Sequence, residues 1–78
     1  MRPLGDPNRL RLLLLLHRIG DLPVFELAAR SDMQPSAVSH AMRLLRAQEV
    51  VGSRREGRNV VYFLRCSDVA AVLDRVIP

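Results

Sequence analysis

Hydrophobic residues recur along this chain at two different spacings. Over residues 34–48 they return every third or fourth position, which is the spacing of one face of an α-helix, and over residues 10–16 leucines occur all round a stretch of helical length. Over residues 50–65 they form two β-branched and aromatic runs, and over residues 67–77 the helical spacing returns. The pattern predicts a mainly α chain with a small β-hairpin before the last helix.

The first helical stretch, about residues 6–18, lies between a capping pair and a glycine. Asp6 and Pro7 suit the first turn of a helix, and Gly20 suits the position after the last turn. The inward side of this helix is predicted to carry Leu10, Leu13, Leu14 and Leu16. The segment 22–24 is expected to be extended, because a residue before proline avoids the helical region, and to lend an edge strand to the hairpin.

Two more helices follow at the spacing of a helix-turn-helix motif. They are predicted over about residues 25–31 and 34–48, with a turn of three or four residues around Asp32. The inward side of the shorter helix is expected to carry Phe25, Leu27 and Ala28.

The helix over residues 34–48 has two chemically distinct faces. Its apolar face carries Val38, Ala41, Met42 and Leu45. The opposite face carries amide, hydroxyl, imidazole and guanidinium groups, which donate to DNA phosphates and base edges. The predicted DNA-contacting residues are Gln34, Ser36, Ser39, His40, Arg43 and Arg46. For His40 alone, packing against the first helix is an equally good interpretation.

The hairpin, about residues 50–65, is predicted to be a basic wing. Gly57 supplies a left-handed turn position, and Arg54, Arg55 and Arg58 surround it. We expect these guanidinium groups to hold phosphates or to enter a minor groove; the alternative is that they only keep a sheet edge soluble. The order of elements is that of a winged helix-turn-helix, in a single domain over residues 1–78.

Composition favours DNA as the partner over a membrane or a substrate. The net charge is +4, and all twelve residues of the Lys+Arg count are arginine. Five of them lie between Arg43 and Arg58, against two acids, as in a nucleic-acid binder. The longest apolar run, Leu12 to Leu16, is too short to span a membrane, so a cytoplasmic protein is expected. No catalytic motif is present, so the chain is not expected to be an enzyme.

Five blocks of the sequence resemble the ArsR/SmtB family of bacterial winged-helix repressors. They are Gly5 to Leu12, Val24 to Ala28, Ser36 to His40, Leu44 to Arg46, and Arg54 to Arg58 with Tyr62. The segment 22–24 and the Ser36 block are most similar to the nickel/cobalt-sensing branch. The resemblance implies a homodimeric repressor that binds double-stranded DNA and is released by an effector.

The chain departs from the family pattern at three positions around the third helix. Asp32 and Glu49 stand where the family usually has glycine. Aspartate tolerates a left-handed conformation, whereas Glu49 opposes the helix dipole and is expected to loosen the helix end. Ala41 stands where the family often has a second polar residue, so one DNA contact is expected to be missing.

A second copy of the chain is expected to add buried surface. A chain of 78 residues buries only a modest fraction of its surface, and its one cysteine cannot form an internal disulfide. The interface is predicted on the last helix, about residues 67–77, with the first helix as a further contributor. The apolar face of that last helix carries Val69, Val72, Leu73 and Val76.

No cofactor is expected. The family's metal site near Val24 to Leu27 lacks its cysteines here, and the site at the start of the last helix is represented only by Cys66 and Asp68. Because the distal ligands implied by the resemblance are not found up to Pro78, we favour a structural role for both residues; a divalent metal effector is the alternative.

A DNA-binding transcriptional regulator is therefore the preferred function. The alternative is a winged-helix module for protein contact, or a truncated relative that dimerises with a longer paralogue without repressing by itself, because only five residues precede Asp6.

Overall fold

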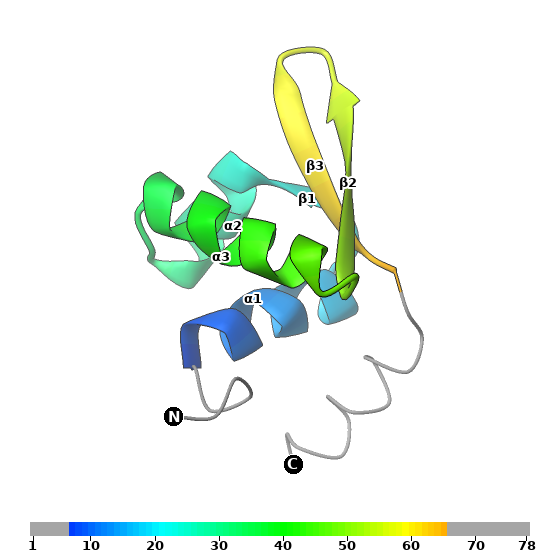
Figure 1. Ribbon diagram of the computed structural model, residues 1–78. Helices are drawn as coiled ribbons and strands as arrows, with labels where there is room; N and C mark the ends of the chain where they lie inside the picture. The colour runs from blue at the N-terminus through cyan, green and yellow to red at the C-terminus, as the bar shows by residue number, and fades with distance from the viewer. Residues whose placement is uncertain (1–6, 66–78) are drawn as a thin grey trace.

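In the part of the chain that the structure describes, three helices pack together and a β-hairpin extends beyond them (Figure 1). The computed structural model describes residues 7–65 of the chain. Its elements are α1 (Pro7–Arg18), β1 (Leu22–Pro23), α2 (Val24–Ser31), α3 (Pro35–Ala47), β2 (Val51–Glu56) and β3 (Asn59–Leu64). The predicted mainly α architecture, with a helix-turn-helix and a small hairpin, is confirmed. The helix predicted over residues 67–77 lies outside the described residues.

The hairpin is part of a three-stranded antiparallel sheet in the order β1-β3-β2. Gly57 and Arg58 connect the two long strands, and Gly57 has a φ of 63°. Glycine with a positive φ at the first position of a two-residue turn fits the type II′ turn of hairpins. Leu22 pairs with Tyr62, so the predicted edge strand is confirmed and joins the base of the hairpin to the helices.

The core lies where the three helices meet the base of the hairpin. Its fully buried apolar side chains come from all three helices and from β2: Leu12, Leu27, Val38, Met42 and Val51. All four residues predicted for the apolar face of α3 are buried. Burying a side chain of this size contributes about 1.5–3 kcal/mol. The inner face of α3 therefore fixes the helix in place while its outer face meets solvent.

The predicted inward direction of Phe25 is wrong. Its relative exposure is 58%, whereas Leu27 and Ala28 are buried as predicted. An α-helix turns by about 100° per residue, so Phe25 lies about 200° around α2 from Leu27, on the opposite face. Hydrophobic character alone misled the prediction.

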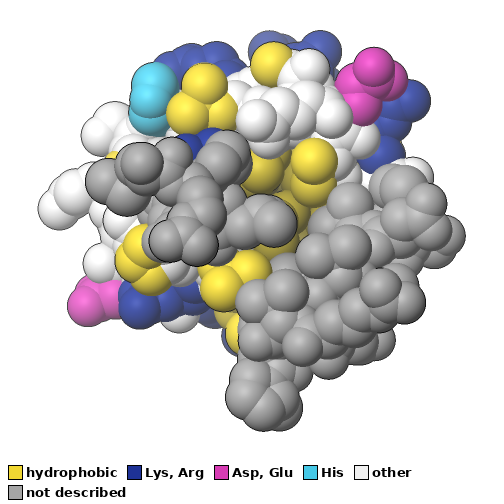
Figure 2. Space-filling view, turned by 60° about the horizontal axis from the view of Figure 1, so that its bottom comes forward, with side chains coloured by type: hydrophobic (Ala, Val, Ile, Leu, Met, Phe, Trp, Pro, Cys, Tyr) yellow, Lys and Arg dark blue, Asp and Glu magenta, His cyan; other side chains and the backbone are white. Residues whose placement is uncertain are grey.

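In α1, the most deeply buried leucine, Leu12, is not among the four predicted. Leu13 and Leu16 are buried as predicted, whereas Leu10 and Leu14 are only half-buried. Leucine occupies every side of this helix, so periodicity does not identify the inner one. Figure 2 views the molecule from the side of α1 and shows hydrophobic side chains at the centre of that face.

Both turns that flank α3 contain a residue in the left-handed region. Asp32 has a φ of 61° and Glu49 a φ of 60°. After α3, the N–H of Glu49 donates to the carbonyl of Arg46 at 2.9 Å, and the N–H of Val50 donates to the carbonyl of Leu45 at 3.0 Å. These two bonds form a Schellman motif. Hydrogen bonds therefore close the helix end that Glu49 was expected to loosen through the helix dipole.

Replacing Glu49 with glycine is expected to raise the free energy of unfolding by about 0.5–1 kcal/mol, because glycine has no Cβ to strain a left-handed backbone. The substitution also removes the ion pair between Glu49 and Arg65, whose charged atoms are 3.9 Å apart. Both side chains are exposed, so this pair contributes little to stability. Ala47→Gly is the matched control: Ala47 has no positive φ, and the change should cost up to about 1 kcal/mol. Urea unfolding measures the stability of both variants. An equal loss of stability in the two would contradict a strained backbone at Glu49.

Candidate nucleic-acid interface

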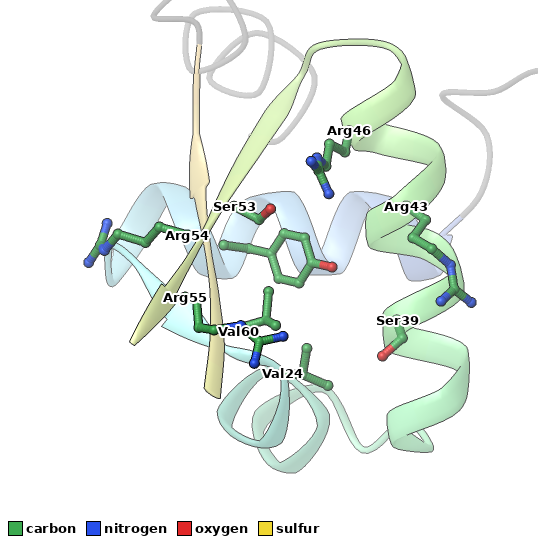
Figure 3. Close-up of a pocket in the computed structure, with 9 residues that line it drawn as sticks. Val24, Ser39, Arg43, Arg46, Ser53, Arg54, Arg55 and Val60 are labelled. Atoms are coloured by element: carbon green, nitrogen blue, oxygen red, sulfur yellow. The ribbon is translucent and has the colours of Figure 1, made fainter. Parts of the chain in front are cut away.

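A groove of about 420 Å³ lies between α3 and the hairpin (Figure 3). Its lining comes from α2, α3 and both long strands: Val24, Ser39, Arg43, Arg46, Ser53, Arg54, Arg55, Val60 and Tyr62. Figure 3 shows Ser39 and Arg46 directed from α3 toward the hairpin. Basic residues predicted separately, on the third helix and on the wing, thus border one concave surface.

The alternation of β2 decides which hairpin side chains face α3. Successive residues of a strand point to opposite faces, so Ser53 and Arg55 share one face and Arg54 lies on the other. Ser53 pairs with Tyr62 and Arg55 pairs with Val60, which places these four side chains on the face toward α3. Arg54 borders the groove, but Figure 3 shows its guanidinium on the far side of the strand.

The groove has a strongly positive character. No aspartate or glutamate is among its lining residues in the described part of the chain. Within residues 7–65, Arg43, Arg46 and Arg55 form no ion pair, and all three are exposed. Three unpaired guanidinium groups beside the hydroxyls of Ser39 and Ser53 provide donors for an anion with several oxygen atoms, such as a phosphodiester.

Arg54 differs from the other predicted wing contacts because it already has anionic partners. Its Nη1 donates to Oδ2 of Asp21 at 2.8 Å, and its Nε donates to Oε2 of Glu56 at 2.6 Å. The hydrogen bonds to Asp21 and to Glu56 raise the pKa of Arg54 above its ordinary value. The sequence pattern grouped Arg54 with Arg55 and Arg58 because it does not reveal the distant Asp21.

The first turns of α3 and the hairpin turn carry the remaining predicted contacts. Gln34 is exposed at the N-cap of α3, Ser36 and His40 are exposed on the helix, and Arg58 is exposed at the hairpin turn, all outside the groove. His40 borders a second groove, of about 310 Å³, together with Asn8 and Arg9 at the start of α1. His40 therefore lies on the side of α3 that faces α1. This is the side expected if His40 packs against the first helix.

The interpretation of Ala41 as a lost contact is wrong. Ala41 is 7% exposed and belongs to the core cluster, next to the fully buried Met42. A polar side chain at this position would point into the protein and not toward a ligand. Ala41 comes three residues after Val38 and four before Leu45, so helical periodicity already placed it on the apolar face of α3.

Sequence reasoning did not propose Ser53 or Tyr62 as site residues. Both line the groove, and Tyr62 is only 6% exposed. Ser53 on β2 pairs with Tyr62 on β3, and this register brings the two hydroxyl-bearing residues to the same face of the sheet. Period-two alternation from Arg55 back to Ser53 could have identified Ser53, once Arg55 was placed toward α3.

In residues 7–65, no three His, Cys, Asp or Glu side chains gather closely enough to hold a metal ion. Cys66 and Asp68 lie outside this range, as do the predicted interface residues Val69, Val72, Leu73 and Val76. None of the helices between residues 7 and 65 has the length and apolar character needed to cross a membrane.

Comparison with known proteins relates this chain to a family. Residues 6–53 match the model described as bacterial regulatory protein, arsR family. The chain is 44% identical over 77 residues to the HTH-type transcriptional regulator NmtR of Mycobacterium tuberculosis, covering 99% of this chain and 63% of the relative. It is 52% identical over 61 residues to the transcriptional repressor SmtB homolog of Synechocystis, covering 78% of this chain and 46% of the relative. The chain thus spans less than two thirds of either relative.

Solved structures agree with this relation. The AntR antimony-specific transcriptional repressor superposes with a TM-score of 0.88 at 35% identity, over 95% of this chain and 67% of that one. The homodimeric winged helix-turn-helix DNA-binding domain of a Mycobacterium bovis protein superposes with a TM-score of 0.84 at 30% identity, over 94% of this chain and 67% of that one. The winged helix-turn-helix fold predicted from the sequence is confirmed.

Proposed function

Because this chain belongs to the arsR family of bacterial regulatory proteins, we propose that it is a sequence-specific double-stranded DNA-binding transcriptional regulator acting as a homodimeric repressor. The observation that carries this proposal is the groove between α3 and the hairpin, where the described lining contains no acid and Arg43, Arg46 and Arg55 form no ion pair within residues 7–65. Such a surface attracts the phosphate backbone of DNA through charge and binds it through guanidinium donors.

The geometry assigns different parts of DNA to the two elements. The exposed face of α3 has the size and donors to enter a major groove, where side chains distinguish base pairs. The hairpin beside it reaches toward the neighbouring minor groove. Between the two grooves runs a sugar-phosphate strand, and it would cross the groove lined by Arg46 and Arg55. Ser39 and Arg43 then lie closest to base edges, and Ser36 and His40 flank them.

A homodimer would place two copies of α3 on successive half-sites, about 34 Å apart along DNA. The half-buried Leu10 and Leu14 of α1 support a contribution of this helix to the interface. The described relative from Mycobacterium bovis is a homodimeric domain, and the same assembly is proposed here. The residues predicted on the last helix, Val69, Val72, Leu73 and Val76, complete this proposal.

The family relation supports a proposal for regulation and location. We propose a cytoplasmic repressor that is released by an effector, with no cofactor needed to build the groove. The relatives are named as regulators of transcription and not as enzymes, which also favours a regulatory role over a catalytic one. The same names favour DNA binding over a module for protein contact alone.

The proposal is tested by fluorescence anisotropy of the purified chain with duplex DNA from upstream of its own gene and with a scrambled duplex of equal length. We expect tighter binding to the upstream DNA, and an affinity for both that falls steeply as salt is raised. Absence of binding at low salt would refute DNA binding. Equal affinity for the two duplexes would refute sequence-specific binding at this site.

Arg55→Ala is expected to weaken binding to specific and scrambled DNA by a similar factor. Because Arg55 is an unpaired guanidinium on the hairpin, its loss should remove one phosphate contact and reduce the slope of log affinity against log salt by about 0.9. Titrations at four salt concentrations give that slope. A loss confined to the specific duplex would instead make Arg55 a base-reading residue.

A further inference from the structure

Arg54, which borders the groove, belongs to a connected group of side chains on the outer face of the hairpin. Arg54 lies at its centre, with Asp21 on one side at 2.8 Å and Glu56 on the other at 2.6 Å. Asp21 belongs to the turn between α1 and β1, whereas Glu56 ends β2 next to the hairpin turn. One guanidinium thus links the helical body to the distal part of the hairpin.

Phe63 provides a surface under this guanidinium. The centre of the Arg54 guanidinium lies 5.9 Å from the centroid of the Phe63 ring, within cation–π range. The ring lies over Gly52, its cross-strand partner, where an added Cβ would come within 2.5 Å of the ring. Glycine at position 52 is therefore what lets the ring lie across β2 and support Arg54.

The sheet register shows how far the Arg54 side chain reaches. Arg54 pairs with Val61 on β3, and Leu22 of β1 pairs with Tyr62 on the other edge of the same strand. Continuing that register by one residue places Asp21 opposite Phe63. The Arg54 side chain therefore crosses the outer face of β3, from one edge of the three-stranded sheet to the other.

The charges around Arg54 make it a poor phosphate ligand. One positive group is shared by two carboxylates, so the cluster carries a net negative charge. A DNA phosphate would have to displace Asp21 or Glu56 from Arg54 and would then meet both acids. Arg43, Arg46 and Arg55 have no such competitor within the described residues.

We propose that Arg54 is a positioning residue, which holds the hairpin at a fixed angle to α3 by tying β2 to Asp21 in the turn between α1 and β1, and is not itself a DNA contact. This inference rests on the proposed DNA-binding function. A single exposed ion pair is weak. Here Glu56 on the same strand and the Phe63 ring on β3 hold the planar guanidinium in one orientation, so its pair with Asp21 forms with less loss of side-chain freedom.

The test compares Arg54→Ala, Arg54→Lys and Asp21→Asn with the Arg55→Ala control in salt titrations of specific DNA binding. The three variants should each lower affinity about three- to tenfold and leave the salt slope unchanged, whereas Arg55→Ala should lower the slope. Lysine keeps the charge but lacks the planar fork, so Arg54→Lys should behave like Arg54→Ala. Asp21→Asn is the sharpest variant, because removal of an acid would by charge alone strengthen DNA binding.

A measurement without DNA separates failure of this inference from failure of the proposed function. Amide hydrogen exchange along β2 and β3 should be faster in Asp21→Asn and Arg54→Ala than in the wild type, with exchange in α3 unchanged. Unchanged exchange in the strands, a lower salt slope in Arg54→Ala, or tighter DNA binding by Asp21→Asn would each overturn the positioning role. If the wild type bound no DNA, the exchange measurement would still test whether Arg54 positions the hairpin.

Discussion

Met42→Ala is expected to lower the free energy of unfolding by about 2–5 kcal/mol, the range for truncating a fully buried methionine to alanine. Met42 has no exposed surface and packs in the cluster that joins α3 to the other helices. A chain of this size has a total stability of about 5–15 kcal/mol, so one truncation removes a large share of it. The loss should also reduce DNA binding, because the outer face of α3 is oriented by the inner one.

Leu44→Ala is the matched control for this experiment. Leu44 lies two residues further along the same helix, but 41% of its surface is exposed, so the same kind of truncation should change stability by less than about 0.5 kcal/mol. Urea unfolding at one protein concentration measures both variants, since a dimer would make apparent stability depend on concentration. Similar losses in the two variants would mean that α3 is not packed through Met42 as described.

Arg43→Ala is expected to weaken specific DNA binding about 5- to 150-fold, which corresponds to the loss of one good base contact worth about 1–3 kcal/mol. Binding to scrambled DNA should fall much less. Arg43 is exposed on α3, lines the groove and has no ion-pair partner within residues 7–65. It therefore enters the complex without first breaking a contact in the protein.

Arg30→Ala controls for the loss of one positive charge. Arg30 is an exposed arginine of α2 that pairs with Glu26 at 3.7 Å and does not line the groove. We expect it to change both affinities by less than threefold. If Arg43→Ala reduced specific and non-specific binding by the same factor, Arg43 would be a phosphate contact and base reading would have to come from Ser39 or its neighbours.

Much of the fold could be predicted because local signals agree with one another. Asp32 interrupts two helical patterns at a three-residue turn, and the proline at position 23 forces an extended segment just where β1 forms. The inner face of α3 follows from periodicity alone. Phe25 and Leu12 were misplaced for the same physical reason: where apolar residues occupy several sides of a helix, only tertiary packing selects the buried one.

The site was harder to predict than the fold, because it depends on pairings between distant residues. The basic character of α3 and of the hairpin is visible in the sequence, but the difference between Arg54 and Arg55 is not. It arises from strand alternation and from Asp21, which lies 33 positions away from Arg54 along the chain. The inclusion of Ser53 and Tyr62 likewise depends on the register of β2 against β3.

The position of Tyr62 has a practical consequence for spectroscopy. The chain contains one tyrosine and no tryptophan, so excitation of its aromatic fluorescence at long ultraviolet wavelengths selects a single side chain. That side chain lines the groove between Arg46 and Arg55 and is almost fully buried. We therefore expect its emission to change when this surface is occupied, so that binding can be followed without an attached dye.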